Sequence, residues 1–406
     1  FKGPTICGIQ NANRLPGFDY SMSSLFRRLS AALAAGSALA ALPASAAELY
    51  GTEVVQQATI RFYDRYGANE SGWQMLAPLT YVGTYELSPT FDVDVHAKTA
   101  YVAAQTNFFG GDYDYSGLTD SVVGATFTAT GYAGWQPFVT LDLNLPTGKS
   151  DVDFGESLTL ADPDLVDLAR YGEGFNTNLS AGASVFLNPS WTLTAATGFN
   201  WRGEYRPYAG AGDELDPGDQ FMALLRVQYL TETQFGSLQL RYRTEGTSRF
   251  FGQDIVDPGD RIELKGEAAV QLDAHSTLSL LASGSWWDKN AYYDFFTDAA
   301  VKETANSNGA VYYAEIKYQR DLGKVDLRTF ASIKRRTSND YDTFDFRFRP
   351  KRTIWRVGAS IDYAVSDATA LTFGATGGQL IQADDGFVGE TTYLNWSLTA
   401  GVSTSF

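Results

Sequence analysis

Cysteine is nearly absent from this chain of 406 residues, and the single one is Cys7. One thiol forms no internal disulfide and supplies no cysteine cluster for a metal ion. Histidine occurs only twice, which leaves little material for histidine-based catalysis or metal binding. Apolar runs of roughly 20 residues, which membrane-spanning helices need, are also missing, and the mean hydropathy is -0.20. The sequence therefore excludes a bundle of transmembrane helices and predicts neither a metal nor another cofactor.

Positive charge is scarce relative to negative charge. The chain carries 31 Lys and Arg against 47 Asp and Glu, for a formal net charge of -16. General nucleic-acid binding needs a basic footprint, so this class of function is excluded. Aromatic residues are abundant at 14%, and there are 39 glycines. This composition is typical of strands and tight turns.

The N-terminal region predicts a secretory signal. Arg27 and Arg28 precede the apolar Ala/Leu block 29–42, and Ala44-Ser45-Ala46 forms a small-residue cleavage site. Three segments are therefore expected: an upstream extension at 1–21, a signal peptide at 22–46 and a single folded domain at 47–406. The mature protein is expected to begin at Ala47.

Alternation with a period of two recurs along the rest of the chain. In 191–201, Trp191, Leu193 and Phe199 fall on one face, while Thr192, Thr194 and Asn200 fall on the other. The same pattern marks 221–229, 262–270, 312–318, 355–363 and 393–406. Several polar faces carry repeated charges, which are improbable in the dry core of a sandwich. They fit the wet lumen of a wide barrel.

The connections between these segments alternate in length. Short turns are expected near 131–134, 188–190, 231–234, 273–275, 321–323 and 366–368. Long polar loops are expected near 107–119, 146–174, 203–218, 247–259, 288–308, 337–350 and 382–391. With further strands at 54–64, 75–87 and 91–106, the count is about 16, with 14 to 18 left open. The prediction is an all-β, antiparallel up-and-down transmembrane barrel with short periplasmic turns and long extracellular loops.

Aromatic residues fall at both ends of the predicted strands, as expected for rings that settle at two membrane interfaces. Those on the short-turn side are Trp191, Tyr229, Tyr363 and Phe406; those on the loop side are Trp201, Phe221, Trp286, Trp355 and Trp396. The ten steps from Trp191 to Trp201 span roughly 33 Å along a strand. Tilted by about 40°, such a strand rises about 25 Å, the height of the apolar band of these barrels.

Taken together, the signal segment, the alternating strands and the terminal Phe406 resemble a Gram-negative outer-membrane β-barrel channel of the porin-like kind. The resemblance implies a place in the cell outer membrane, contact with its lipid, and recognition of Phe406 by the barrel-assembly machinery. Residues 116–127 and 139–151 are also similar to the phenol-degradation (MetA-type) family of outer-membrane transporters.

Charged side chains on the polar faces are the candidate pore lining. The basic members are Arg226, Arg241, Arg243, Lys265, Lys317, Arg328, Lys334 and Arg356; the interleaved acids are Glu263, Glu267, Glu315, Asp326 and Asp362. They predict either a cross-strand lattice of ion pairs that stiffens the wall or a basic track that guides anions.

The long loop 146–174 follows the fifth strand of this count. In general porins, the loop at this position folds into the lumen and narrows it. Asp162-Pro163 resembles a helix start, with Asp as the cap and Pro as the first helical residue. Asp162, Asp164 and Asp167 would then bring negative charge inward. An external loop is the alternative.

Other motifs have simpler interpretations. Gly148-Lys149-Ser150 resembles the end of a phosphate-binding loop, but Leu143 stands where the first glycine should be, so a turn is expected. His96 lies two residues from Asp94 on one face, and a polar lumen pair is favoured over a catalytic one. Acid-rich loop segments lack a full calcium-ligand spacing.

The favoured function is passive diffusion of small solutes through a charged lumen, without catalysis. The solutes would be polar or anionic, or aromatic if the phenol-degradation resemblance is informative. An outer-membrane barrel that hydrolyses lipid or peptide is the first alternative, and a structural or adhesive barrel is the second. The oligomeric state, a homo-oligomer included, is left open by the sequence.

Overall fold

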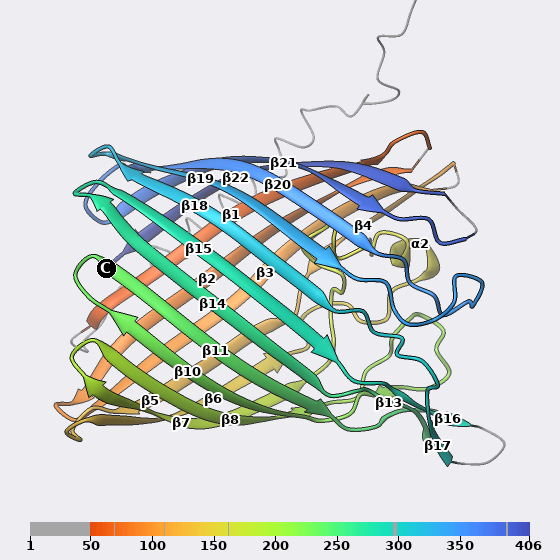
Figure 1. The fold of residues 1–406 in the computed structure, drawn as a ribbon, viewed down its shortest axis with the longest axis horizontal. Coiled ribbons are helices and arrows are strands. Elements are labelled where there is room, and N and C mark those ends of the chain that lie inside the picture. Colours follow the sequence, from red (N-terminus) through yellow and green to blue (C-terminus); the bar gives the residue numbers. More distant parts are fainter. Residues whose placement is uncertain (1–48, 69, 109, 161, 295–298, 387–388) are drawn as a thin grey trace, which may run out of the picture.

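The computed structural model is a closed barrel (Figure 1). Its wall has sixteen strand positions, and each strand is antiparallel to its neighbours. The structure describes residues 49–68, 70–108, 110–160, 162–294, 299–386 and 389–406. The predicted signal peptide and the start at Ala47 lie outside these residues. Within the described ranges, no helix has the length and apolar character needed to cross a lipid bilayer.

In the first half of the wall, strands that follow one another in the sequence are neighbours in the barrel. Its strands are β1 (Leu49–Arg65), β2 (Ser71–Ser88), β3 (Phe91–Phe108), β4 (Gly111–Leu118), β5 (Ser121–Ala129), β6 (Trp135–Leu145), β7 (Asn176–Asn188), β8 (Trp191–Arg202) and β10 (Gln220–Leu230).

The second half returns to the first strand. Its strands are β11 (Gln234–Glu245), β14 (Arg261–Asp273), β15 (Ser276–Trp287), β18 (Val311–Asp321), β19 (Val325–Arg336), β20 (Arg352–Ala364), β21 (Thr369–Gln382) and β22 (Thr391–Ser405). The barrel closes where β1 pairs with β22, from Glu53 opposite Ser405 to Arg65 opposite Tyr393. Closure leaves no sheet edge, which is the requirement for a β-structure in lipid.

One wall position is shared by two strands. The sheet has 17 strands, but β4 and β5 both pair with β3, one after the other along its length. They behave as one strand broken at Thr119-Asp120. The predicted long loop at 107–119 is therefore wrong, because β3 continues to Phe108 and turns directly into β4.

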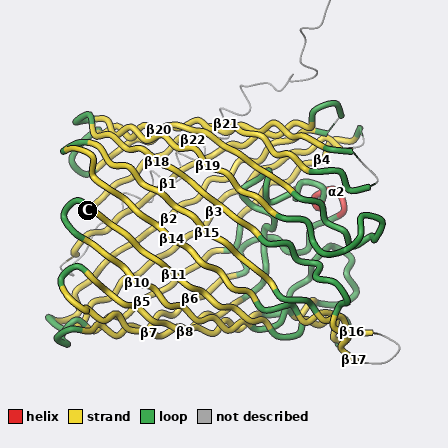
Figure 2. The backbone as a smooth tube through the Cα atoms, in the orientation of Figure 1, coloured by secondary structure: helices red, strands yellow, loops and turns green. Residues whose placement is uncertain are grey.

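The lengths of the connections confirm the predicted alternation. The strands join through short turns at one end, which we call the short-turn end, and mostly through long segments at the other, the loop end (Figure 2). Gly134 and Gly323 adopt positive φ angles of 86° in two of the short turns, a conformation that costs glycine nothing. The C-terminus lies at the short-turn end (Figure 1).

Three loops at the loop end form a second, five-stranded sheet. Its strands are β9 (Leu215–Asp216), β12 (Ser248–Phe250), β13 (Gln253–Asp257), β16 (Ala291–Asp294) and β17 (Ala299–Lys302). The other element at this end is the one-turn helix α2 (Phe154–Ser157), which begins at Asp153 with a capping box to Glu156. α2 lies in the connection between β6 and β7.

Cross-strand register fixes which side chains face outward. Directly paired residues share a face, so the outward row through Ile262 contains Tyr242 and Trp286. The outward aromatics Trp191, Trp201, Trp286, Trp355 and Trp396 are each between 41% and 46% exposed. Some of these rings contact each other between strands, as Trp191 and Tyr229 do at 5.0 Å. The structure thus places the predicted aromatic residues on the outer surface.

Candidate functional site

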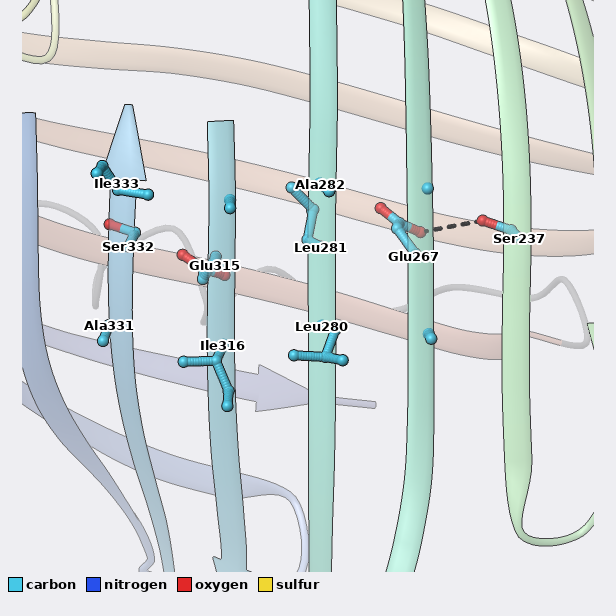
Figure 3. A pocket seen from close by; sticks show the side chains of 13 residues that line it. Ser237, Glu267, Leu280, Leu281, Ala282, Glu315, Ile316, Ala331, Ser332 and Ile333 are labelled. Atoms are coloured by element: carbon cyan, nitrogen blue, oxygen red, sulfur yellow. Dashed lines mark hydrogen bonds between the residues drawn. The ribbon is translucent and has the colours of Figure 1, made fainter. Parts of the chain in front are cut away.

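The candidate site is the lumen, whose charges gather on one part of the wall. The register places all the predicted pore-lining side chains on inward faces: Arg226, Arg241, Arg243, Glu263, Lys265, Glu267, Glu315, Lys317, Asp326, Arg328, Lys334, Arg356 and Asp362. Inward residues alternate with mostly apolar outward ones along each strand, as Glu315 does with Ile316 on β18 (Figure 3).

Many of these charges pair along or across strands. The shortest cross-strand pair joins Arg328 Nη2 to Asp362 Oδ2 at 2.6 Å, and Lys317 Nζ lies 3.2 Å from Glu315 Oε1 on its own strand. Lys265 contacts Glu267, and the Glu267 carboxylate also accepts a 3.4 Å hydrogen bond from Ser237 (Figure 3). These contacts neutralise part of the inward charge, mostly between residues of the same strand.

Other arginines are less engaged. Arg241 Nη1 lies 3.8 Å from Glu263, whose carboxylate is held more closely by Arg261 at 2.8 Å. Within the described ranges, Arg226 and Arg243 form no ion pair, and the buried Nε of Arg226 has no hydrogen-bond partner. Inward positive charge on β10 and β11 is therefore only partly neutralised.

The loop between β6 and β7 enters the lumen. Its base is held by Asp120, at the break between β4 and β5. The Asp120 carboxylate accepts hydrogen bonds from the backbone of Gly148 at 3.0 Å and of Glu173 at 2.7 Å. A side chain at Gly148 would begin 2.0 Å from the Tyr171 carbonyl oxygen, so glycine alone permits this close approach. Gly148 thus serves the fold of the loop.

The three predicted loop carboxylates all meet basic side chains of the wall. Asp162 contacts Arg352, Asp164 accepts from Lys334 Nζ at 2.6 Å, and Asp167 lies 2.5 Å from Arg61 Nη2. Asp164, which is 6% exposed, also lies 3.8 Å from Arg352, and its carbonyl accepts from Arg356 at 2.7 Å. Buried carboxylates with such partners hold a segment in place because losing a partner leaves an uncompensated charge.

Apolar contacts complete the docking of the loop. Leu165 and Val166, each 3% exposed, pack with the inward side chains of Tyr63, Ile354 and Leu380. Burial of two such side chains contributes roughly 1.5 to 3 kcal/mol each. The inner wall carries an apolar patch at this level, which the loop covers.

The predicted helix at Asp162-Pro163 is wrong. Asp162 begins a single turn, in which its carbonyl accepts from Leu165 at 2.7 Å and its side chain accepts from the Asp164 backbone. The turn ends early because Asp164, Asp167 and Leu168 each take a partner on the wall. The short helix of this loop, α2, lies earlier.

Ionisation differs among loop groups. The pKa of Lys149 is raised by its hydrogen bonds to Glu156, at 2.6 and 2.7 Å. Burial raises the pKa of Tyr171 to about 12, and its ring stacks on Tyr115 at 3.8 Å. At neutral pH, Lys149 is therefore protonated and positively charged, and Tyr171 is protonated and neutral.

His96 has a different partner from the predicted one. Asp94 accepts a 2.6 Å hydrogen bond from Thr84, whereas His96 Nε2 lies 3.1 Å from Asp142 on β6. The two side chains meet over Gly124 on β5, where any Cβ would clash with both. Among the described residues, no hydroxyl group hydrogen-bonds to His96. The described residues likewise contain no cluster of three or more potential metal ligands.

The predicted pore lining leaves out five residues that face the lumen: Arg61, Gln74, Arg261, Arg336 and Arg352. Arg61 lies on β1, where no pore-lining residue was predicted. The other basic ones share the parity of predicted residues on the same strands, as Arg336 does with Lys334 and Arg352 with Arg356. Extending each alternating face by one or two residues would have found them. Gln74 carries no such signal because it is uncharged and lies in the poorly alternating first third.

No protein-family model matches the chain, and no curated protein matches it. The similarity to the phenol-degradation family therefore stays a prediction. The solved structures that resemble the fold include outer-membrane channels. One from Pseudomonas putida F1 is 14% identical, with 65% of this chain and 95% of that chain covered and a TM-score of 0.42.

Two further channels cover more of the chain. OccAB1 of Acinetobacter baumannii is 9% identical over 90% of this chain and 100% of its own, with a TM-score of 0.45. OpdK of Pseudomonas aeruginosa, crystallised with vanillate, is 11% identical over 87% of this chain and 99% of its own, with a TM-score of 0.42. The closed barrel itself is established independently by the strand register of this chain.

Proposed function

We propose that this protein is an outer-membrane channel through which small polar solutes diffuse passively, with anions favoured. The lumen supplies a shaped electric field and no covalent chemistry. Its partners would be outer-membrane lipid, the transported solutes and, through Phe406, the barrel-assembly machinery. The proposal is supported by the outer surface, the docked loop and the distribution of charge.

The outer surface supports a lipid environment. Large apolar side chains stand outward on successive strands and are 40% to 50% exposed, among them Leu225, Leu240, Leu264, Ile316 and Val357. Soluble proteins rarely expose contiguous apolar surface on this scale. Lipid chains would cover it, and the aromatic residues at its margins fit the interfaces.

The observation that carries the proposal is the asymmetric docking of the β6–β7 loop. Its lumen contacts are to β1, β2, β3, β4, β19, β20, β21 and β22. In the described residues, it forms no hydrogen bond or ion pair with β10, β11, β14 or β15. The loop thus narrows the lumen from one side and leaves a passage along the other.

Charge favours anions in that passage. The loop carboxylates are engaged by Arg61, Lys334 and Arg352, so their negative charge is largely compensated. Facing them, β11 lies eight wall positions from β1 and carries Arg241 and Arg243. Guanidinium groups stay charged throughout the accessible pH range. A narrow pore lined in this way concentrates anions.

The test is the reversal potential of the folded protein in a planar bilayer under asymmetric salt. The wild type should conduct and favour anions, and Arg241→Glu with Arg243→Glu should shift the reversal potential toward cations. This shift should shrink in concentrated salt because the Debye length falls from about 8 Å to about 3 Å at 1 M.

A matched control makes the same change of charge outside the lumen. Arg320 faces outward near the short-turn end and Lys324 lies in the following turn. Replacing both with Glu should leave selectivity unchanged. Absence of conductance in the wild type would contradict the channel and favour the structural or adhesive alternative.

A further inference from the structure

The lumen has a second compartment, which lies beside the docked loop. A cavity of about 680 Å³ lies between residues 167–173 of the docked loop and the inner faces of β2, β3 and β5 to β8. Its size falls within the range of small-molecule sites. Its polar lining contains four asparagines, Asn144, Asn176, Asn178 and Asn200, together with charged side chains that mostly have protein partners, as Asp167 has Arg61 and Asp142 has His96.

Register aligns these amides in two adjacent rows. One row runs across neighbouring strands from Asp142 through Asn178 and Asn200 to Gln220. The other places Asn144 beside Asn176. Side chains paired in this way lie about 5 Å apart, close enough for one ligand to contact several of them.

Several of these groups keep hydrogen-bonding capacity for a ligand. Asn178 donates to Asp142 at 3.0 Å, but its own buried Oδ1 has no partner. In the described part of the chain, Asn200 and Lys98 form no hydrogen bond or ion pair. An amide offers two donors and an acceptor, so the rows suit groups that both donate and accept, as hydroxyls do.

An apolar surface borders the same cavity. Leu76, Pro78 and Leu168 are among its lining residues. A ligand with hydroxyl groups at its edges and C–H groups on its faces would match both surfaces. Such a ligand needs no net charge.

Between the cavity and the short-turn end, the inner wall formed by the described residues of β5 to β8 is uncharged. Beyond Asp142, the inward residues of β5 to β8 include no charged side chain in the described ranges. They are mostly small or hydroxylated, with hydrogen bonds between Thr126 and Thr140 at 2.9 Å and between Ser184 and Thr194 at 2.8 Å. A neutral solute that leaves the cavity would meet an uncharged path.

We infer that this cavity is a binding subsite for neutral polyhydroxylated solutes of the saccharide class, separate from the anion passage along β10 to β14. The inference rests on the proposed channel only in that a route through the lumen would deliver the solute. The asparagine side chains would hydrogen-bond the solute, and the uncharged wall below the cavity would let the solute leave.

The experiment measures equilibrium binding of maltose to the folded, full-length barrel in a detergent without a sugar headgroup. The wild type should bind saturably. Asn178→Leu with Asn200→Leu should weaken binding at least about tenfold, the equivalent of losing one or two hydrogen bonds. Asn200→Leu alone should weaken it less and carries less risk to folding because Asn200 has no hydrogen-bond partner among the residues that the structure describes.

The controls separate the subsite from the rest of the lumen. Gln228→Leu with Gln239→Leu removes two inward amides from β10 and β11, outside the cavity, and should leave maltose binding unchanged. If Lys98→Gln abolished binding while the Asn178 and Asn200 replacements had no effect, and gluconate bound more tightly than maltose, the cavity would be an anion site and the inference wrong.

Two results distinguish this inference from the channel proposal. Maltose binding in micelles without conductance in bilayers would overturn the channel and leave the subsite standing. Conductance without saturable maltose binding would overturn the subsite alone.

Discussion

Gln74 is the residue on which the position of the lumen loop depends most directly. Its side chain, on the inward face of β2, is 1% exposed. Its Oε1 accepts from the backbone N–H groups of Asp167 at 3.1 Å and Leu168 at 2.9 Å, and its Nε2 donates to the Leu168 carbonyl at 2.8 Å. One amide therefore satisfies three backbone groups of the loop.

Gln74→Leu keeps the approximate volume of the side chain and removes all three bonds. At about 1 kcal/mol for each hydrogen bond, the docked loop loses about 3 kcal/mol relative to the undocked one. This corresponds to a shift of roughly a hundredfold in the docking equilibrium. The estimate is a lower bound because buried backbone groups left without partners cost more.

Hydrogen exchange measures this shift directly. Protection of the Leu165 and Val166 amides should fall by roughly a hundredfold in Gln74→Leu, since both exchange when the loop undocks. In a bilayer, the same variant should show a higher mean conductance and more current fluctuation. The matched control is Gln239→Leu, an inward glutamine on the opposite wall, and it should change neither quantity.

Unchanged exchange at Leu165 and Val166 in a fully folded Gln74→Leu barrel would refute this reasoning. The ion pairs of Asp162, Asp164 and Asp167 would then hold the loop without the amide.

Three further expectations concern closure, ionisation and assembly. The barrel should stay folded in cold SDS and change its mobility after boiling, because opening exposes every paired backbone group at once; identical mobility would argue against a closed wall. Arg347 lowers the pKa of Asp345 to about 2 from 3.8, so this contact is fully present above about pH 4 and is lost as the pH falls through about 2. A carboxyl NMR titration with a midpoint near 4 would contradict it. Deleting Phe406 should lower the amount of assembled barrel in the outer membrane, and normal levels would remove its role as an assembly signal.

The strands were predictable because apolar and polar residues alternate along each one, which shows which side chains face outward. Strands predicted at 54–64, 75–87 and 91–106 appear as β1, β2 and β3, each longer than predicted. The prediction failed at β4, where the alternation of polar and apolar residues is reversed relative to the inner and outer faces of the wall. Asp112 and Asp114 face outward there and Tyr115 faces inward, because β4 lies at the loop end and carries part of the docked loop.

The partners of the site residues were harder to foresee. Asp94 looked like the partner of His96 because it is two residues away, but Asp142 reaches His96 across β5. Local spacing cannot reveal a contact that depends on the register of three strands and on the absence of a side chain at Gly124. The loop carboxylates were found because they cluster, while Gln74 gave no signal of charge or spacing.

Closure of the wall has a consequence for the order of folding. Thr59 on β1 meets Thr399 on β22 through hydroxyl groups separated by 340 positions in the chain. The loop contacts from Asp162 and Asp164 to β19 and β20 span 170 to 192 positions. Contacts this distant form late, because the intervening chain must first be ordered. The passage therefore acquires its final width among the last events of folding, after β20 has taken its place beside β19.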